Sequence, residues 1–326
     1  MEYFLGADVG GTKTNIAICD ENGNIHGFGT SGPGNPQEVG YPGLLASLQT
    51  ALQVSTKQAG ITSAQISAAG FGIAGYDWPS TLPKMTEVVE QLGLDCPYKI
   101  VNDAVLGLVA GARDGWGISV VSGTGCNCRG WDKDRQREGR VTGFGSLMGE
   151  GAGASELVQQ AMLMVGYSWA KRVPPTRLCE DFIRFSGAKN LEDLLEGYTE
   201  GHYSIGAKAA PLVIKAAMAG DEVAIDLLIW AGKQLGEMAN CVARQLDFEK
   251  LAYEVVMVGS MFRENPIMVT AMRDTILLQS PKATLTHLTE PPVLGALVIG
   301  IETHGKHCTA MLRGNMTRTL LGSWNS

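Results

Sequence analysis

The amino-acid sequence predicts an α/β protein of two domains, each opened by a glycine-rich β-hairpin. Three observations support this fold class. The chain has 326 residues, and domains commonly contain roughly 100–200 residues. Strand and helix patterns alternate along the sequence. A strand, a glycine-rich turn and a second strand occur at the N-terminus and again from residue 116. We therefore expect domains at residues 1–115 and 116–326, joined near RDGWG (113–117).

The first domain is expected to begin with three strands, at residues 3–9, 15–19 and 25–29. The third strand returns after Asn22-Gly23, a dipeptide that favours a tight hairpin turn. Apolar residues at helical spacing then predict a helix over 41–58. The remaining pattern predicts a strand at 66–72, a helix near 83–92, a strand at 98–102 and a helix after Asp103.

The second domain repeats this order. WGISVVSGTGCNCRGW (116–131) reads as strand, turn and strand, and DKDRQREGR (132–140) as a solvated hairpin tip. Residues 170–250 are expected to be mostly helical. A buried strand at 253–260, a helix, a strand at 283–288 and a last helix from Val293 complete the domain. We expect this last helix to pack back on the N-terminal domain.

Composition and charge exclude several classes of protein. The net charge of −7 argues against a general nucleic-acid binder or anionic-membrane binder, because such proteins are usually basic. No apolar run approaches the ~20 residues that span a bilayer, and the N-terminus lacks the basic region of a signal peptide. We expect a cytoplasmic protein whose seven cysteines are reduced thiols, since Cys126 and Cys128 have no second pair to complete a zinc site.

The segment GADVGGTK (6–13) nearly matches a phosphate-binding P-loop, but Thr12 stands where the lysine belongs. A P-loop also needs a helix directly after it, whereas TNIAICD (14–20) has the pattern of a strand. We therefore predict a phosphate-binding hairpin. Gly10 and Gly11 are expected to adopt positive φ and expose N–H donors. Thr12 and Lys13 add a hydroxyl and a charge, and Asp8 is a candidate ligand for hydrated Mg²⁺.

Two later segments fit the remainder of a nucleotide site. VVSGTGCN (120–127) places Thr124 and Gly125 in a second strand–strand turn, where a second group of phosphate contacts is expected. VVMVGS (255–260) ends a buried strand with Gly259 and Ser260, which are candidates for the nucleoside because ligands in such folds bind at carboxyl ends of strands.

These motifs resemble the phosphate-1, phosphate-2 and adenosine motifs of the actin/hexokinase/Hsp70 ATPase superfamily, in order and over nearly the whole chain. More narrowly, the sequence resembles the N-acetylglucosamine kinases of the BadF/BadG/BcrA/BcrD ATPase family. The segments that carry this resemblance are GPGNP (32–36), GIAGYD (72–77), VNDA (101–104), GTGCNCRG (123–130) and GFGSLMGEGAG (143–153).

The resemblance implies two ribonuclease H-like domains with an ATP cleft between them, ATP and Mg²⁺ as cofactors, and a homodimer. It implies a kinase that phosphorylates the 6-hydroxyl of an amino sugar, N-acetylglucosamine or glucosamine. Asp103 matches the base, and the sugar contacts would be Asn35, Asp77, Asn127 and Glu150. Independently of the family, Asp103 lies where a strand ends and a helix begins, although Asp is also a favoured helix N-cap.

Two departures leave the acceptor open. The sugar kinases usually read G-D-E-G where this chain has Gly149-Glu150-Gly151, so one carboxylate is longer and another is missing. Ala74 stands where a small hydroxyl residue is expected.

A kinase of the repressor/ORF/kinase group is a competing interpretation, but its Cys-rich zinc motif is incomplete here. A reductase-activating ATPase and a sugar-responsive regulator without kinase activity remain alternatives.

Overall fold

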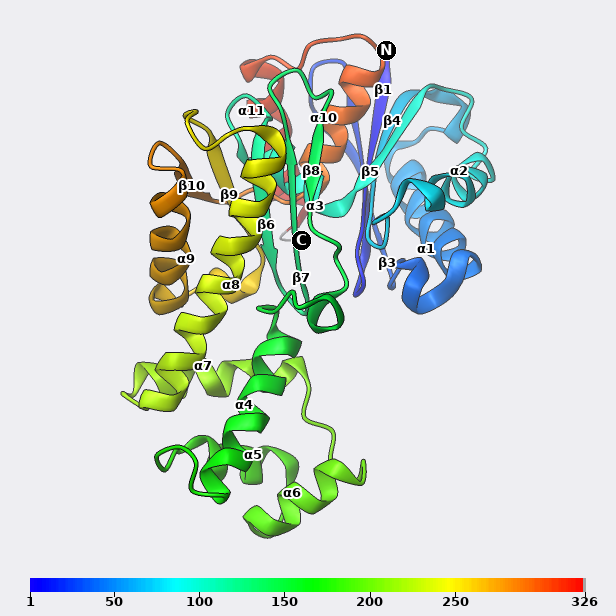
Figure 1. The fold of residues 1–326 in the computed structure, drawn as a ribbon. Coiled ribbons are helices and arrows are strands. Elements are labelled where there is room, and N and C mark those ends of the chain that lie inside the picture. Colours follow the sequence, from blue (N-terminus) through cyan, green and yellow to red (C-terminus); the bar gives the residue numbers. More distant parts are fainter. Residues whose placement is uncertain (325–326) are drawn as a thin grey trace. The chain divides into compact units, whose positions relative to one another are not determined.

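A computed structural model describes residues 1–324, and the chain divides into two compact units. The first unit contains Met1–Ser119, Gly130–Arg137 and Thr286–Ser326, and the second contains Val120–Arg129 and Glu138–Leu285. Strands of two five-stranded sheets form the framework (Figure 1). The C-terminal segment therefore folds with the N-terminal residues.

The first sheet has the order β3-β2-β1-β4-β5. Its strands are β1 (Tyr3–Val9), β2 (Thr14–Asp20), β3 (Ile25–Ser31), β4 (Ile66–Ile73) and β5 (Tyr98–Asn102). β2 pairs antiparallel with β1 and β3, whereas β1, β4 and β5 run parallel. All five strands were predicted, to within two residues at each end. Because β1, β4 and β5 are parallel, their carboxyl ends lie at one edge of the sheet.

Helices pack on both faces of this sheet. The side chains of Leu5, Ala7 and Val9 enter a core that also contains residues of α1 (Pro36–Ala59) and α2 (Leu82–Glu90). Gly6 points the opposite way, and a Cβ there would come within 2.5 Å of a backbone nitrogen of α10 (Val293–Thr303). α10 also packs on β4 and on α3 (Asp103–Gly111). Alternate residues of β1 therefore pack against helices on opposite faces of the sheet.

The second sheet has the order β10-β9-β6-β7-β8. Its strands are β6 (Gly117–Ser122), β7 (Cys126–Trp131), β8 (Glu138–Arg140), β9 (Glu254–Val258) and β10 (Thr284–His287). If the five strands of this sheet are numbered by their order in the chain, their spatial order, starting from β8, is 3-2-1-4-5. The first sheet has the same order. The internal duplication expected from the element order is therefore present in the topology.

The helices of the second unit lie between β8 and β9 and after β9. They are α4 (Ala154–Trp169), α5 (Leu178–Ser186), α6 (Leu191–Thr199), α7 (Ala210–Met218), α8 (Glu222–Leu246) and α9 (Pro266–Gln279).

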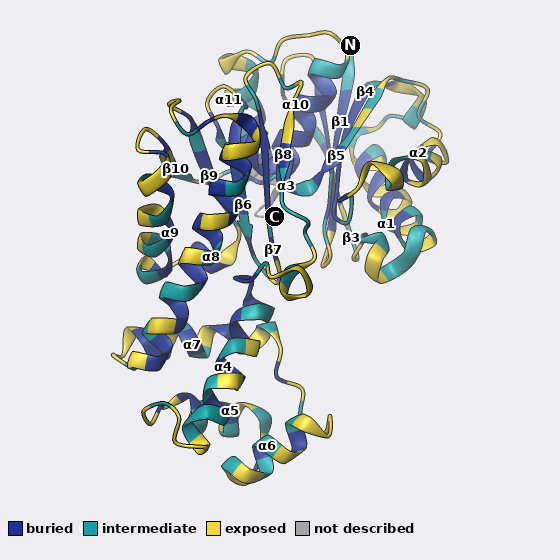
Figure 2. Ribbon diagram, viewed as in Figure 1, coloured by how far each residue is buried: buried dark blue, intermediate teal, exposed yellow. Residues whose placement is uncertain are grey.

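The two units also contain short 3₁₀ turns, at Ser63–Gln65, Pro79–Thr81, Gly145–Met148, Ala207–Ala209 and Ser260–Phe262. Strands β1, β2 and β4 and helix α10 are among the most deeply buried elements, whereas α5 and α6 carry many exposed residues (Figure 2).

Two helix predictions were incomplete. α1 begins at Pro36 rather than residue 41, because the Asn35 side chain caps it, and it kinks at Gly40 (φ 69°) just before Pro42. α11 (Ala310–Trp324) was not predicted as a separate helix. Its sequence has a weak apolar stripe, and Met316 and Leu320 are its buried side chains among those described. Only tertiary packing identifies such a helix.

Three expectations from composition can be compared with the structure. All seven cysteines are free thiols. Among residues 1–324, no cluster of His, Cys, Asp and Glu has the makings of a three-ligand metal site. Within the same residues, every helix is too short or too polar to cross a bilayer.

Candidate active site

The candidate site residues of the first unit gather at the edge where the parallel strands end. Val9 pairs with Ile73, and Ile73 with Asn102, so Asp8 and Asp103 lie near the carboxyl ends of β1 and β5, two parallel strands with β4 between them. The backbone N–H of Ala74 donates to Val9 O at 2.8 Å. This edge is the usual ligand-binding position of α/β sheets.

The loop Gly10–Lys13 is a hairpin turn and not a P-loop. Gly10 N donates to Lys13 O at 2.9 Å, and Thr14 begins a strand. The expectation of positive φ was wrong, because neither Gly10 nor Gly11 has it. A Cβ on Gly11 would lie 3.1 Å from the carboxylate of Glu38, an exposed side chain that can move aside, so packing does not require a glycine at this position either. Thr12 and Lys13 are exposed at the tip.

Asp8 is half-buried, and its carboxyl is poorly solvated. Desolvation raises its pKa to about 6, although the Asn15 amide opposite it and the charge of Lys13 act in the other direction. A nearby cation stabilises the charged form of such a desolvated carboxyl group. One carboxylate, water and phosphate oxygens are a usual Mg²⁺ ligand set, so Asp8 fits the metal that the sequence predicts.

Asp103 is the first residue of α3, but it does not cap that helix. The N-cap is Asn102, whose Oδ1 accepts from Ala104 N at 3.0 Å. Helix capping was the competing explanation for an aspartate at this position. Because Asn102 performs it, capping does not account for the aspartate at this strand–helix junction.

Asp77 and Asn35 lie in one hydrogen-bonded network at this edge. Asp77 is 4% exposed and accepts from Gln37 Nε2 at 2.9 Å and from Asn102 Nδ2 at 3.4 Å. Asn35 caps α1 by accepting from Gln37 N at 3.0 Å. Sequence reasoning missed Gln37, which links the two, and Asn102, which donates to Asp77. A polar residue two positions after the cap was the one available signal for Gln37.

The turn between β6 and β7 carries Thr124 and Gly125, both exposed. The N-terminus of α4 supports it: Ala154 N donates to Gly123 O at 2.8 Å, and Ser155 N to Thr124 O at 2.9 Å. A Cβ at Gly123 or Gly125 would meet no protein atom within 4 Å, and neither glycine has positive φ. Since neither packing nor backbone conformation requires glycine there, the space suits a ligand approaching the backbone N–H groups.

Gly259 follows β9 and touches the same turn. Its φ is 116°, and a Cβ there would lie 2.1 Å from Ser122 O. Ser260 is exposed and begins the next 3₁₀ turn. The structure therefore brings together four predicted residues of the second unit: Thr124, Gly125, Gly259 and Ser260.

Replacing Gly259 with Ala is expected to lower the free energy of unfolding by about 2 kcal/mol, because the residue has a glycine-favouring φ and no room for a Cβ. Gly187→Ala is the matched control, since Gly187 also has positive φ (78°) but open space around it; it should cost about 1 kcal/mol. Urea denaturation of both variants tests this. Equal losses would mean that the contact with Ser122 is unimportant.

Asn127 and Glu150 are the remaining predicted residues. Asn127 is half-buried on β7, and its Oδ1 accepts from Cys128 N at 2.8 Å. The Glu150 carboxylate organises its own loop: it accepts from Thr142 N, Thr142 Oγ1 and Gly143 N at 2.6–2.8 Å and from Phe144 N at 3.1 Å. Their roles as sugar ligands stay predictions. Next to Glu150, a Cβ on Gly151 would lie 2.8 Å from the Trp230 ring.

The duplicated sheet and its glycine turns define the actin-like ATPase fold. Consistent with this, a structure from Chromobacterium violaceum, proposed to be an N-acetylglucosamine kinase, superposes with a TM-score of 0.69 at 24% identity, over 92% of this chain and 99% of that one. A ROK family glucokinase from Streptomyces griseus, solved with glucose and AMPPNP, gives 0.59 at 19% identity over 93% and 100%.

The chain belongs to the BadF/BadG/BcrA/BcrD ATPase family, whose model matches residues 5–300. It is also similar to two curated proteins at 25% identity. These are an N-acetyl-D-glucosamine kinase of Dictyostelium discoideum (93% of this chain, 98% of that protein) and an N-acetylmuramic acid/N-acetylglucosamine kinase of Clostridium acetobutylicum (92% and 98%). The family resemblance seen in the sequence is thereby confirmed.

Proposed function

We propose that this protein is an ATP-dependent kinase that phosphorylates the 6-hydroxyl of an amino sugar, N-acetylglucosamine or glucosamine. Family membership and the two curated kinases, each similar over more than nine-tenths of the chain, support the reaction class. The single observation that carries the assignment of the base is the position of Asp103, at the end of a parallel strand beside a helix that Asn102 already caps.

The nucleotide would be held by backbone and small side chains. Gly10, Gly11, Thr12 and Lys13 in the first unit, and Thr124 and Gly125 in the second, present N–H, hydroxyl and ammonium donors to phosphates. Gly259 and Ser260 would line the nucleoside. Asp8 would hold Mg²⁺, which neutralises charge on the phosphates when bound.

Phosphoryl transfer needs an acceptor oxygen in line with the γ-phosphate and a base near its proton. In the proposed reaction the Asp103 carboxylate accepts that proton as the acceptor oxygen bonds to phosphorus and the bond to ADP breaks. Asp77 and Asn35, fixed through Gln37, would orient hydroxyl groups of the sugar. Such fixed polar groups discriminate strongly between acceptors.

The test is ADP release from Mg-ATP with glucosamine, N-acetylglucosamine and neutral hexoses as acceptors. We expect release to depend on an amino sugar. ADP release without any dependence on an acceptor would support an activator ATPase instead, and sugar binding without ADP release would support a regulator. Either result contradicts the kinase proposal.

The missing family glutamate gives a prediction about the acceptor pocket. Gly151→Glu should destabilise the protein by about 2 kcal/mol, because the new side chain meets the Trp230 ring. Adding Trp230→Ala should recover part of this loss and change the ratio of kcat/KM between glucosamine and N-acetylglucosamine. Thermal unfolding and acceptor kinetics measure both effects. Additive destabilisation in the double variant would show that the two positions are not coupled.

A further inference from the structure

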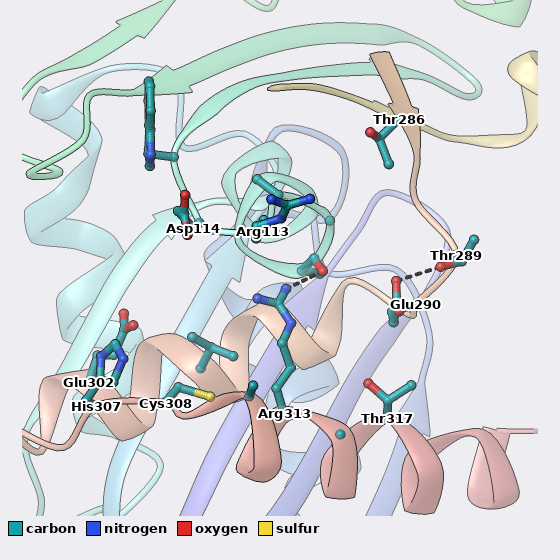
Figure 3. Close-up of a pocket in the computed structure, with 18 of the residues that line it drawn as sticks. Arg113, Asp114, Thr286, Thr289, Glu290, Glu302, His307, Cys308, Arg313 and Thr317 are labelled. Carbon is teal, nitrogen blue, oxygen red and sulfur yellow. Dashed lines mark hydrogen bonds between the residues drawn. The ribbon is translucent and has the colours of Figure 1, made fainter. Parts of the chain in front are cut away.

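The first unit contains a second pocket, of about 1200 Å³, that no motif in the sequence indicates. It is lined by the residues after α3, the hairpin tip between β7 and β8, the end of β10 and the segment 307–318 (Figure 3). Asp103 begins α3 and this pocket lies at the other end of the helix, about 12 Å away along its axis. The pocket is therefore separate from the edge that carries Asp8 and Asp103.

Its lining is positively charged although the chain is acidic. Five Lys and Arg side chains and three carboxylates face it, which gives a formal excess of two positive charges (5 − 3). The whole chain has a net charge of −7. The cations are Arg113, Lys133, Arg135, Arg313 and Arg318. Converging Arg and Lys side chains are the usual recognition elements for phosphate.

Some of these charges have structural partners. Arg135 forms an ion pair with Glu302, which balances one carboxylate. Arg313 rises from α11 into the pocket (Figure 3), where its Nη2 donates to the carbonyls of Val109 and Ala110 at the end of α3. Lys133 is exposed and has no ion-pair partner within residues 1–324. The pocket thus combines fixed guanidinium groups with a cation available to a ligand.

The pocket also has groups that suit the remainder of such a ligand. Asp114 and Glu290 supply carboxylates, and Thr286 and Thr317 supply hydroxyls. Carboxylates accept hydrogen bonds from hydroxyl or amino groups. The volume is more than a free phosphate ion requires and suits a small organic ligand. We propose that this pocket binds a small phosphate ester that carries hydroxyl or amino groups, separately from the site of phosphoryl transfer.

Glucosamine 6-phosphate is the probe, because it offers a phosphate to the cations and an amino group to the carboxylates. Hydrogen exchange of the full chain should show saturable protection of residues 110–116, 286–290 and 307–318. Glucosamine, which lacks phosphate, should not protect them at the same concentration. No protection at roughly 10 mM probe, or protection confined to residues 8–13 and 122–126, would overturn the proposal.

The double variant Lys133→Gln, Arg318→Gln should raise the dissociation constant of the probe about tenfold at low salt and less at high salt. The control Lys250→Gln, Lys282→Gln makes the same charge change at exposed residues outside the pocket and should have no effect. Equal weakening by both pairs would mean general charge attraction and would contradict the proposal. Asp103→Asn should leave this protection intact, so the result does not depend on the kinase reaction.

Discussion

Asp103→Asn is expected to lower kcat for amino-sugar phosphorylation by about 10³, within the range usual for loss of a general base. An amide of the same shape fills the site but cannot take up the acceptor proton. Calorimetric titration with AMPPNP and Mg²⁺ should give the same dissociation constant as for the original protein. The free energy of unfolding should fall by no more than about 1 kcal/mol, because Asn102 keeps the cap of α3 and Asp103 contributes only its charge in the first turn.

Two controls separate catalysis from structure in this experiment. Asn102→Ala removes the cap and also the hydrogen bonds that the buried amide donates to Tyr76 O and Asp77, so it should reduce stability by roughly 1–3 kcal/mol. Asp95→Asn makes the same charge change at an exposed position before β5 and should leave kcat unaltered. Full turnover by Asp103→Asn would eliminate Asp103 as the base. A loss of nucleotide binding equal to the loss of rate would assign it to binding instead.

Asp8→Asn is expected to have opposite effects on stability and on nucleotide binding. The pKa of Asp8 is raised from 3.8 to about 6 by desolvation, so its ionised form is less stable in the folded than in the unfolded protein. Removing that charge should increase the free energy of unfolding at neutral pH by up to about 3 kcal/mol, since two pKa units correspond to 2.7 kcal/mol. The same change removes the carboxylate proposed to hold Mg²⁺.

The direction of the pH dependence follows from this shift. The folded protein binds more protons at Asp8 between the unfolded value of 3.8 and about 6. The stability that Asp8 contributes is therefore full below about pH 4 and is lost as pH rises through about 6. The free energies of unfolding of the original protein and of Asp8→Asn, measured in urea, should be equal below pH 4 and should differ most above pH 7. A constant difference at all pH values would mean that ionisation is not the cause.

Nucleotide binding gives the second measurement for Asp8. Mg²⁺-dependent affinity for AMPPNP should fall in the original protein as pH drops below about 6, because the carboxyl becomes protonated. In Asp8→Asn this dependence should be absent, and the affinity should be low throughout. Unchanged Mg²⁺-dependent affinity in the variant would contradict the role of Asp8 as metal ligand. Stability and binding thus test one carboxyl by independent measurements.

Local pattern was sufficient for the strands of the first sheet, because strand period and turn residues depend on near neighbours. It missed β8 (Glu138–Arg140), since these residues were assigned to the charged hairpin tip at 132–140. The Asn22-Gly23 turn and the apolar run before Asp8 predicted β1 to β3, and the strand after Thr14 already excluded a P-loop. Helix signals were weaker where packing provides the stability. The start of α1 depends on the Asn35 cap and a kink at Gly40, and α11 is a helix whose buried residues are recognised only against β3 and α10.

The candidate site shows the same division. The sequence alone determined the fold class, the hairpin at residues 10–13 and the presence of carboxylates at strand ends, because turn residues and strand period depend on near neighbours. Only the tertiary structure decided that Asn102 caps α3, that Gln37 joins Asn35 to Asp77, and that Trp230 occupies the space beside Gly151. The Gln37 link and the Trp230 contact join residues that are distant in the chain. The cap depends on which of two adjacent side chains, Asn102 or Asp103, makes the hydrogen bond. The local spacing of residues determines neither of these outcomes.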